Sequence, residues 1–359
     1  MNVRTWSPKM RVERGFAVGA IVLAVLWPVL FSPYWAHQLL IETFFYGIAA
    51  SSLIFLSAYG GMISLAQTAM YAIAGFILGN LVTHGGPGGT SKGLHLGWDP
   101  TLALILAIVM TTVIGLILGA VAARSAGIYF LMITLTFAVI GTYFFGQVTK
   151  VSGFSGIGGI NLYTPGWIGD LIAHPNRLYY IALGTAIFVY ALIRYVLRTP
   201  FGLTLQGVRD EPIRMSALGY NVALHRALAF CFGAFIASLA GVLYVWWQGQ
   251  VAPDALGLQQ TINLLVMAVI GGLRRVEGAW IGAFTYIIIN DQLHTVGLPF
   301  GLGGSFNSII GLIFLAIVVV SPDGLMGVWD RLARSAFRGP RGGARVFRPK
   351  DPVPEAGSS

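Results

Sequence analysis

The chain has 359 residues, of which 56% are hydrophobic and only 10% are charged, and its mean hydropathy is +0.76. Soluble domains carry roughly a quarter charged residues, so this composition excludes an ordinary soluble fold and favours a helical membrane protein. The net charge of +9 does not indicate nucleic acid, because the basic residues flank apolar runs. The single cysteine, Cys231, excludes an internal disulfide and a cysteine-cluster metal site.

The placement of charge divides the chain into three regions. A basic N-terminal segment (1–14) and a basic tail (328–359) flank a long apolar region (15–327). Basic flanks of this kind are expected in the cytoplasm, where they contact anionic membrane lipid. The tail contains Gly, Pro and Ser, so we expect it to be disordered beyond Gly339. The run Gly15–Phe31 is too long for a signal peptide core and lacks a cleavage site, so we interpret it as a retained first span.

Apolar runs of about 20 residues are needed to cross the hydrocarbon core of a bilayer. The candidate spans in this chain lie at 15–32, 38–59, 62–83, 101–122, 127–147, 178–196, 227–247, 261–273, 279–295 and 305–321. The sequence therefore predicts an all-α polytopic membrane protein with about ten transmembrane helices. The region 261–295 is the weakest part of this assignment, because two crossings share little length there.

The distribution of positive charge predicts how these spans are oriented. With the N-terminus inside, the inner loops and their borders contain Arg124, Arg194, Arg198, Arg209, Arg214, Arg226, Arg274 and Arg275. The outer loops contain only Lys92, Lys150 and Arg177. This bias follows the positive-inside rule and predicts a multi-pass membrane protein with both termini in the cytoplasm.

Glycine patterns suggest breaks and close packing within the spans. Gly60–Gly61 and Gly271–Gly272 either break helices at membrane depth, as in transport proteins, or form ordinary cytoplasmic turns. The weakly similar segments YGIAASSL (from Tyr46) and FGAFIASL (from Phe232) lie on spans predicted to be antiparallel, as inverted repeats would. Glycines four residues apart favour ordinary helix packing over a dimer face; these are Gly75 and Gly79, Gly115 and Gly119, and Gly278 and Gly282.

Motifs for nucleotide binding or catalysis are missing from the sequence. The stretch GGPGGTSKG, from Gly85, lacks the residue order of a Walker A loop, and the six histidines lack metal-ligand spacing. Glu42 and Asp291 lie near the outer ends of predicted spans, which argues against an intramembrane proton relay. We therefore expect neither enzymatic activity nor a cofactor or metal, and we expect energy for uphill transport to come from a partner protein.

The predicted inner loop 196–226 is unusually polar for this chain. Within it, RDEPIRMSALG (Arg209–Gly219) predicts a helix of about nine residues, with Asp210 as N-cap and Gly219 as a left-handed stop. Its small apolar face would consist of Ile213, Ala217 and Leu218. Such a helix docks into a groove on another protein, lies on the bilayer, or simply connects two spans.

Six segments carry a family resemblance in a fixed order along the chain. They are GGMISLAQTAMYAIAGF, GIYFLMITLTFA, SGFSGIGGINL, TPFGLTLQGVRDEPIRMSALGYNVALHRALAFCFGAFIASLAGVLY, VMAVIGGLRRVEGAWIGA and SPDGLMG. These segments resemble the permeases of bacterial branched-chain amino acid ABC importers (LivM-like), which are close to urea and amide ABC permeases. Together they cover most of residues 45–327.

The resemblance implies a type II ABC-importer fold with broken helices and a cytoplasmic coupling helix. It also implies a place in the bacterial inner membrane, a homologous second permease, two ATPase subunits that bind the ATP, and a periplasmic substrate-binding protein. The role of transmitting ATPase motion carries over to Arg209, Asp210, Glu211, Arg214, Leu218 and Gly219. Where the wider importer motif has Glu-Ala-Ala, this chain has Ile213, Arg214 and Met215, so Glu211 is the alternative candidate for the acidic role.

A path for an apolar amino acid needs an apolar corridor with a few hydroxyls and amides for the ends of the substrate. The candidate path residues are Gln67, Thr68, Thr134, Thr136, Gly158, Gly159 and Asn161. Each also has an ordinary explanation in helix packing or loop flexibility. Two alternative functions stay open: an ABC permease for urea, short amides or aromatic acids, and a secondary carrier or channel that acts without ATPases.

Overall fold

The computed structural model describes residues 35–84, 93–169, 171, 174–295, 311, 312, 315 and 324–327. Several predictions therefore lie outside the described residues: the basic segment 1–14, the first span 15–32, the stretch 85–92 with Lys92, and the tail 328–359. Most of the last predicted span, 305–321, also lies outside them.

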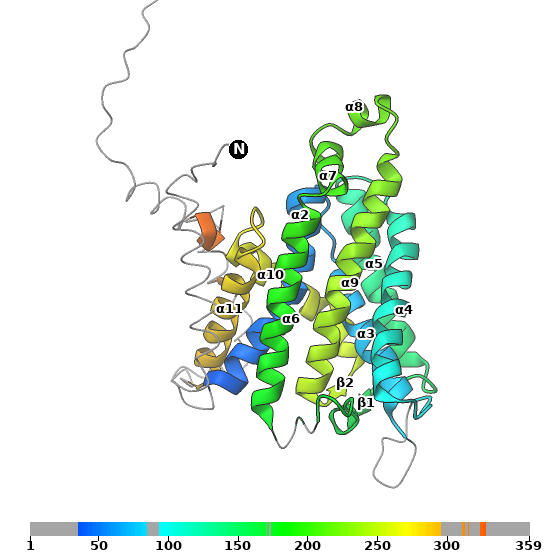
Figure 1. Cartoon of the computed structure of the whole chain (residues 1–359), viewed down its shortest axis with the longest axis vertical. Helices are drawn as coiled ribbons and strands as arrows, with labels where there is room; N and C mark the ends of the chain where they lie inside the picture. Colours follow the sequence, from blue (N-terminus) through cyan, green and yellow to red (C-terminus); the bar gives the residue numbers. More distant parts are fainter. Residues whose placement is uncertain are drawn as a thin grey trace, which may run out of the picture.

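Long helices running along one axis make up most of the described chain (Figure 1). Five of them are long and apolar enough to cross a membrane: α2 (Ile41–Gly60, with the preceding π-helical turn η1, Trp35–Leu40), α4 (Pro100–Ala122), α5 (Ile128–Gln147), α6 (Pro175–Val196) and α9 (Val222–Gln248). Each coincides with a predicted span. Their termini follow local rules, since the Asp99 and Asn221 side chains cap α4 and α9, and Gly249 ends α9 in the left-handed conformation.

Three further helices are shorter than, or marginal for, a full crossing. They are α3 (Gln67–Val82), α10 (Leu258–Gly271) and α11 (Gly278–Thr295). The predicted span 62–83 is wrong at its start, because α2 ends at Gly60 and the chain stays non-helical until Gln67. The pair 261–273 and 279–295 is confirmed as two helices, α10 and α11, joined by a tight turn after Gly271.

The core of the fold is α9, which packs against α2, α3 and α4. Helix α2 is 83% buried over its most apolar window, whereas α4 and α5 are each only 22% buried and expose large apolar side chains, as a surface toward lipid or another subunit would. A Cβ added at Gly115 would clash with Ala234, and one at Gly119 would lie 2.9 Å from Phe230. Helix α4 can therefore approach α9 closely only because these positions are glycine.

The two similar segments on α2 and α9 lie on antiparallel helices, as predicted. Trp247 Nε1, in the last turn of α9, donates to Glu42 Oε1 in the first turn of α2 at 3.3 Å. Phe55 and Phe232 meet edge to face nearer the opposite end, with ring centroids 4.9 Å apart. Glu42 therefore ties two helices together at one end of the bundle.

The two ends of the bundle differ in structure (Figure 1). One end is closed by a two-stranded antiparallel sheet, β1 (Ile157–Gly158) with β2 (Gln250–Val251), and by the 3₁₀ turns η2 (Ile160–Leu162) and η3 (Pro253–Leu256). The other end carries two short helices, α7 (Pro200–Asp210) and α8 (Pro212–Ala217), which join α6 to α9. The charged loop predicted from the sequence is this second end.

Candidate functional site

Helix α7 is fixed to the end of the bundle. It begins at Pro200, and the Thr199 hydroxyl accepts a hydrogen bond from Gly202 N at 3.4 Å. Proline suits this first position, because its missing N–H would have no partner there. Gly202, Leu205 and Val208 are buried on one face of α7. The helix is therefore a rigid base for the segment that follows.

The predicted helix Arg209–Gly219 is wrong at its start. Asp210 is the last residue of α7 rather than an N-cap, and the second helix, α8, has only six residues. The break falls at Glu211 (φ −143°, ψ 79°), because a residue before proline is disfavoured in helical conformation and Pro212 follows. The Asp210 carboxylate is engaged by Arg209 instead, whose Nε and Nη2 both lie 2.7 Å from Oδ1.

The predicted stop at Gly219 is confirmed. Gly219 has φ +88°, and backbone N–H groups of Gly219 and Tyr220 close the end of α8 onto Ser216 O (3.0 Å) and Met215 O (3.1 Å). A Cβ added at Gly219 would meet nothing within 4 Å. The requirement for glycine here is therefore conformational, because L-residues with side chains are disfavoured in this region.

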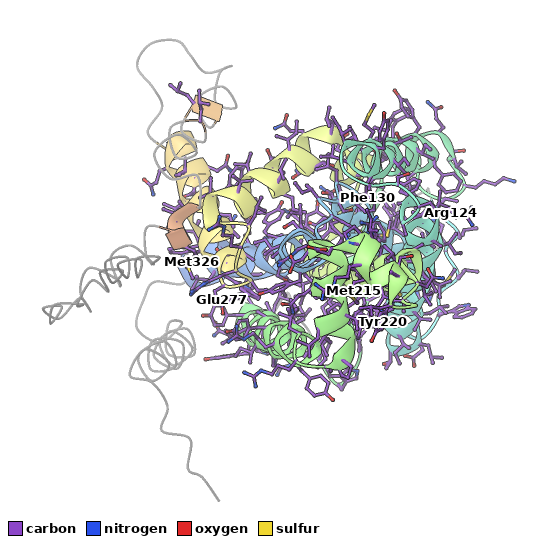
Figure 2. The ribbon with its side chains drawn as sticks, turned by 90° about the horizontal axis from the view of Figure 1, so that it is seen from above. Arg124, Phe130, Met215, Tyr220, Glu277 and Met326 are labelled. Carbon is purple, nitrogen blue, oxygen red and sulfur yellow. The ribbon has the colours of Figure 1, made fainter. Side chains whose placement is uncertain are left out.

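Helix α8 exposes an apolar surface at the tip of the bundle. Ile213 is 86% exposed and Leu218 is 66% exposed, while the neighbouring Glu211 and Arg214 are also exposed. Met215 points the other way, toward α7, because a Cβ added at Gly207 of α7 would lie 2.9 Å from Met215 Sδ. Seen from above, Met215 lies over the middle of the bundle (Figure 2). Apolar side chains held out in this way on a fixed support are typical of a docking surface.

Arg209 is exposed, but its guanidinium and aliphatic part contact the end of α2. Its guanidinium donates to the carbonyl oxygen of Ala58, in the last turn of α2, and its aliphatic part lies over Gly61, the left-handed residue that ends α2. The hydrogen bond from Arg209 also lowers the pKa of the Asp210 carboxyl below its ordinary value. Arg209 therefore joins the α7–α8 element to the point where the second span breaks.

The break after Gly60–Gly61 is a partly buried non-helical segment, in which Gly61 and Ile63 are exposed and the residues that follow turn inward. Ser64 and Ala66 are fully buried, and the Leu65 N–H donates to the Thr134 hydroxyl of α5 at 3.2 Å. Ser64 Oγ accepts from Ala66 N at 3.3 Å. Backbone groups freed inside a membrane protein need such internal partners. Thr134 therefore holds the start of α3 in place.

Replacing Thr134 by valine should destabilise the protein, whereas the same change at Thr136 should not. Thr134→Val leaves the part-buried Leu65 N–H without its acceptor, which costs about 1–3 kcal/mol. Thr136 is exposed, and its hydroxyl bonds only to Met132 O of its own helix. Thermal unfolding of the purified variants checks this, and equal midpoints for the two variants would contradict it.

The predicted path residues fall into separate places along the bundle. Gln67 is fully buried and accepts from Ser52 Oγ at 3.1 Å, while its Nε2 has no hydrogen-bond partner among the described residues. Thr68 borders a small gap lined also by Tyr46, Ala49, Tyr71, Gln260 and Leu264. Thr136 lies on the exposed face of α5. Of these three candidates, the structure therefore places only Thr68 beside the gap, while Gln67 is buried in the contact with Ser52 and Thr136 lies outside.

The other three candidates lie at the β-sheet end. Gly158 pairs with Gln250 in the small sheet, and Gly159 has φ +71° at the start of η2. The Asn161 side chain packs against Gly249, where an added Cβ would lie 2.8 Å from Asn161 Nδ2. These residues shape the end of α9. Contact of these residues with a substrate stays a prediction, as does binding of a substrate at the gap beside Thr68.

Similarity to known proteins then identifies the family. A profile described as the branched-chain amino acid transport system / permease component matches residues 36–321. The chain belongs to this family of transport permeases. The permease is 26% identical to the probable branched-chain amino acid transport permease protein LivM of Methanocaldococcus jannaschii, over 62% of its own length and 68% of the relative's.

Two more relatives extend this result. The permease is 23% identical to the high-affinity branched-chain amino acid transport system permease protein LivM of Escherichia coli, over 88% of its length and 75% of that protein. It is 27% identical to the probable branched-chain amino acid transport permease protein LivH of M. jannaschii, over 66% of its own length and 78% of that protein. No solved structure gave a significant match. The permease is thus a multi-pass membrane component of a transport system.

Some polar contacts of the permease were missed by sequence reasoning. Glu277, in the α10–α11 turn, accepts a hydrogen bond from Tyr190 Oη at 2.8 Å, and Arg194 Nη1 lies 3.6 Å from the same carboxylate oxygen. These contacts join the last turns of α6 to the α10–α11 hairpin; Figure 2 shows Glu277 near Met326. The partners are over 80 residues apart in sequence, and the local sequence carried no signal for these contacts.

Among the described residues, acidic, histidine and cysteine side chains form no group able to hold a metal ion.

Proposed function

We propose that this chain is a permease subunit of an ABC importer that moves branched-chain or related small amino acids across the bacterial inner membrane. In this proposal, separate ATPase subunits supply the energy, and the chain itself binds no ATP. The observation that carries it is the α7–α8 element, which exposes Ile213 and Leu218 at one end of the bundle while Arg209 bonds to the end of α2.

Charge supports placing the α7–α8 end in the cytoplasm. The arginines Arg124, Arg194, Arg198 and Arg214 belong to the helix ends and loops on that side. The described basic residues on the opposite, β-sheet side are Lys150 and Arg177. Under the positive-inside rule, both termini are then cytoplasmic and the β-sheet side is periplasmic.

Coupling would run from the ATPases through α8 into the spans. The docking surface consists of Ile213, Leu218 and the exposed charged side chains of Glu211 and Arg214, and Gly219 sets its shape. Arg209 then passes movement of α7 to Gly61 and the α2–α3 break, because it contacts the end of α2 directly. Asp210 orients Arg209.

The importer would contain further subunits. LivM and LivH of M. jannaschii are two permeases of one organism, and the chain is similar to both, which favours a second, homologous permease as the partner. The exposed apolar side chains of α4 and α5 offer a surface for lipid or for that partner.

A periplasmic binding protein would deliver the substrate to the β-sheet end, near Gly158, Gly159 and Asn161. From there the substrate would pass Thr68 and Gln67.

Reconstitution of the full complex tests this proposal. We expect leucine, isoleucine or valine, delivered by the binding protein, to enter proteoliposomes only when ATP and the ATPase subunits are present. Uptake of urea or a short amide instead of these amino acids would contradict the substrate assignment. Uptake at the same rate without ATP would contradict the importer and favour a secondary carrier or channel.

A further inference from the structure

A cavity of about 250 Å³ opens on the α7–α8 side of the bundle, where three parts of the chain meet. They are the α2–α3 break, the α4–α5 turn with the start of α5, and the N-terminal part of α9. The cavity is lined by Gly61, Met62, Ile63, Ala126, Gly127, Ile128, Phe130, Leu131 and Arg226. None of these positions was singled out for binding by the sequence. The walls are apolar except for one guanidinium and the backbone at the start of α5.

Arg226 brings an unused hydrogen-bond donor to this cavity. Its Nε is buried and has no hydrogen-bond partner among the described residues. Arg226 takes no part in the ion pairs that Arg194 and Arg209 form. Arg226 as a whole is half-buried, but an enclosed Nε–H donor without a partner is unfavourable, so an anionic group that entered the cavity would satisfy it. The first N–H groups of α5 at the cavity wall would also favour negative charge.

The size and the walls of the cavity restrict what else the ligand contains. Pockets for drug-sized ligands span about 300–1,000 Å³, so a cavity slightly below this range suits a smaller molecule. Met62 and Phe130 are almost fully buried and present apolar surface. Carboxylate recognition by Arg226 next to such walls fits a free amino acid with an apolar side chain.

We propose that this cavity is a cytoplasmic-side binding site for an apolar amino acid, in which Arg226 binds the carboxylate. The inference rests on the proposed function, because it takes the substrate class and the cytoplasmic placement of α7–α8 from it. The site adjoins Gly61, where Arg209 contacts the α2–α3 break. A substrate that leaves the permease would occupy it before release, and a high internal concentration of the same amino acid would slow import.

Luminal inhibition of the reconstituted importer tests the site. Proteoliposomes are loaded with ATP, ATPase subunits and increasing leucine, and the initial uptake of labelled leucine from external binding protein is measured. We expect Arg226→Gln to raise the luminal leucine needed for half-inhibition about tenfold, since it removes a charge-assisted bond, and Arg226→Lys to raise it less. Arg124→Gln is the matched control, because Arg124 is exposed nearby, does not line the cavity and lies farther from the middle of the bundle than Phe130 (Figure 2).

Leucinol, which lacks the carboxylate, distinguishes recognition of the anion from nonspecific effects. We expect luminal leucinol to inhibit the wild type weakly and both Arg226 variants equally weakly.

Equal sensitivity of wild type and Arg226→Gln to luminal leucine would overturn the site. So would an Arg226→Gln defect seen only in vesicles containing phosphatidylglycerol, because the cavity would then hold a lipid headgroup. Failure of the wild type to import any amino acid would instead overturn the proposed function, independently of Arg226.

Discussion

Replacing Gly219 with leucine should uncouple ATP hydrolysis from amino acid uptake while leaving membrane insertion intact. Gly219 has φ +88° in open space, so the cost of leucine is backbone strain of about 1–2 kcal/mol and not a clash. The strain would redirect the end of α8 and displace Leu218. Because loss of an interface anchor costs about 2 kcal/mol or more, we expect uptake by the reconstituted complex to fall at least about tenfold.

Two further variants make this result specific. Gly184→Leu on α6 adds the same side chain at an exposed glycine with no atom within 4 Å of an added Cβ, and uptake should stay near the wild-type rate. Leu218→Ala removes the exposed apolar side chain without straining the backbone and should also lower uptake. Wild-type uptake by Gly219→Leu, with the complex fully assembled, would end the docking role of α8.

Replacing Arg209 with alanine should also uncouple ATP hydrolysis from uptake, but at a later step: the ATPases still bind α8 and hydrolyse ATP, while little substrate moves. Arg209 bonds to Ala58 O and lies over Gly61, so its loss separates α7 from the α2–α3 break while the exposed face of α8 remains. Hydrogen bonds to charged groups contribute about 1.5–3 kcal/mol, and we expect uptake to fall roughly fivefold or more. The ratio of amino acid imported to ATP hydrolysed is the measurement.

Neighbouring charge changes serve as controls for Arg209. Arg198→Ala removes an exposed arginine just before α7 and should leave the ratio unchanged. Asp210→Asn weakens the partner of Arg209 but preserves its bond to Ala58, so we expect a smaller loss than for Arg209→Ala. If Arg209→Ala imported as much substrate per ATP as the wild type, Arg209 would be a local support of α7 only.

Helix positions were predictable because length and apolar composition determine them locally. The predicted spans at 101–122 and 127–147 nearly match α4 and α5, and the left-handed stop at Gly219 was visible from one glycine. The start of α3 was not predictable. Residues 62–66 are apolar enough to continue a helix, but Thr134, 69 residues from Leu65, holds them in another conformation.

The candidate site was predictable in place but not in detail. Charge placement located the α7–α8 element, yet the proline after Glu211 splits it into two helices, and Asp210 pairs with Arg209 instead of capping. The roles proposed for Arg209 and Arg226 depend on the contact of Arg209 with α2 and on the cavity that Arg226 shares with α5, and both helices are distant in sequence. Side-chain chemistry alone therefore indicated a docking element, and tertiary packing decided which residues face inward.

Site-directed crosslinking tests the central claim, docking of α8 onto an ATPase, most directly. Leu218→Cys is placed in a Cys231→Ser background, which removes the chain's single native cysteine, and the assembled importer is crosslinked in membranes. Leu162→Cys, exposed on η2 at the opposite end, is the control. We predict a crosslink to an ATPase subunit from position 218 and none from position 162. An assembled importer in which position 218 fails to crosslink to either ATPase would contradict it.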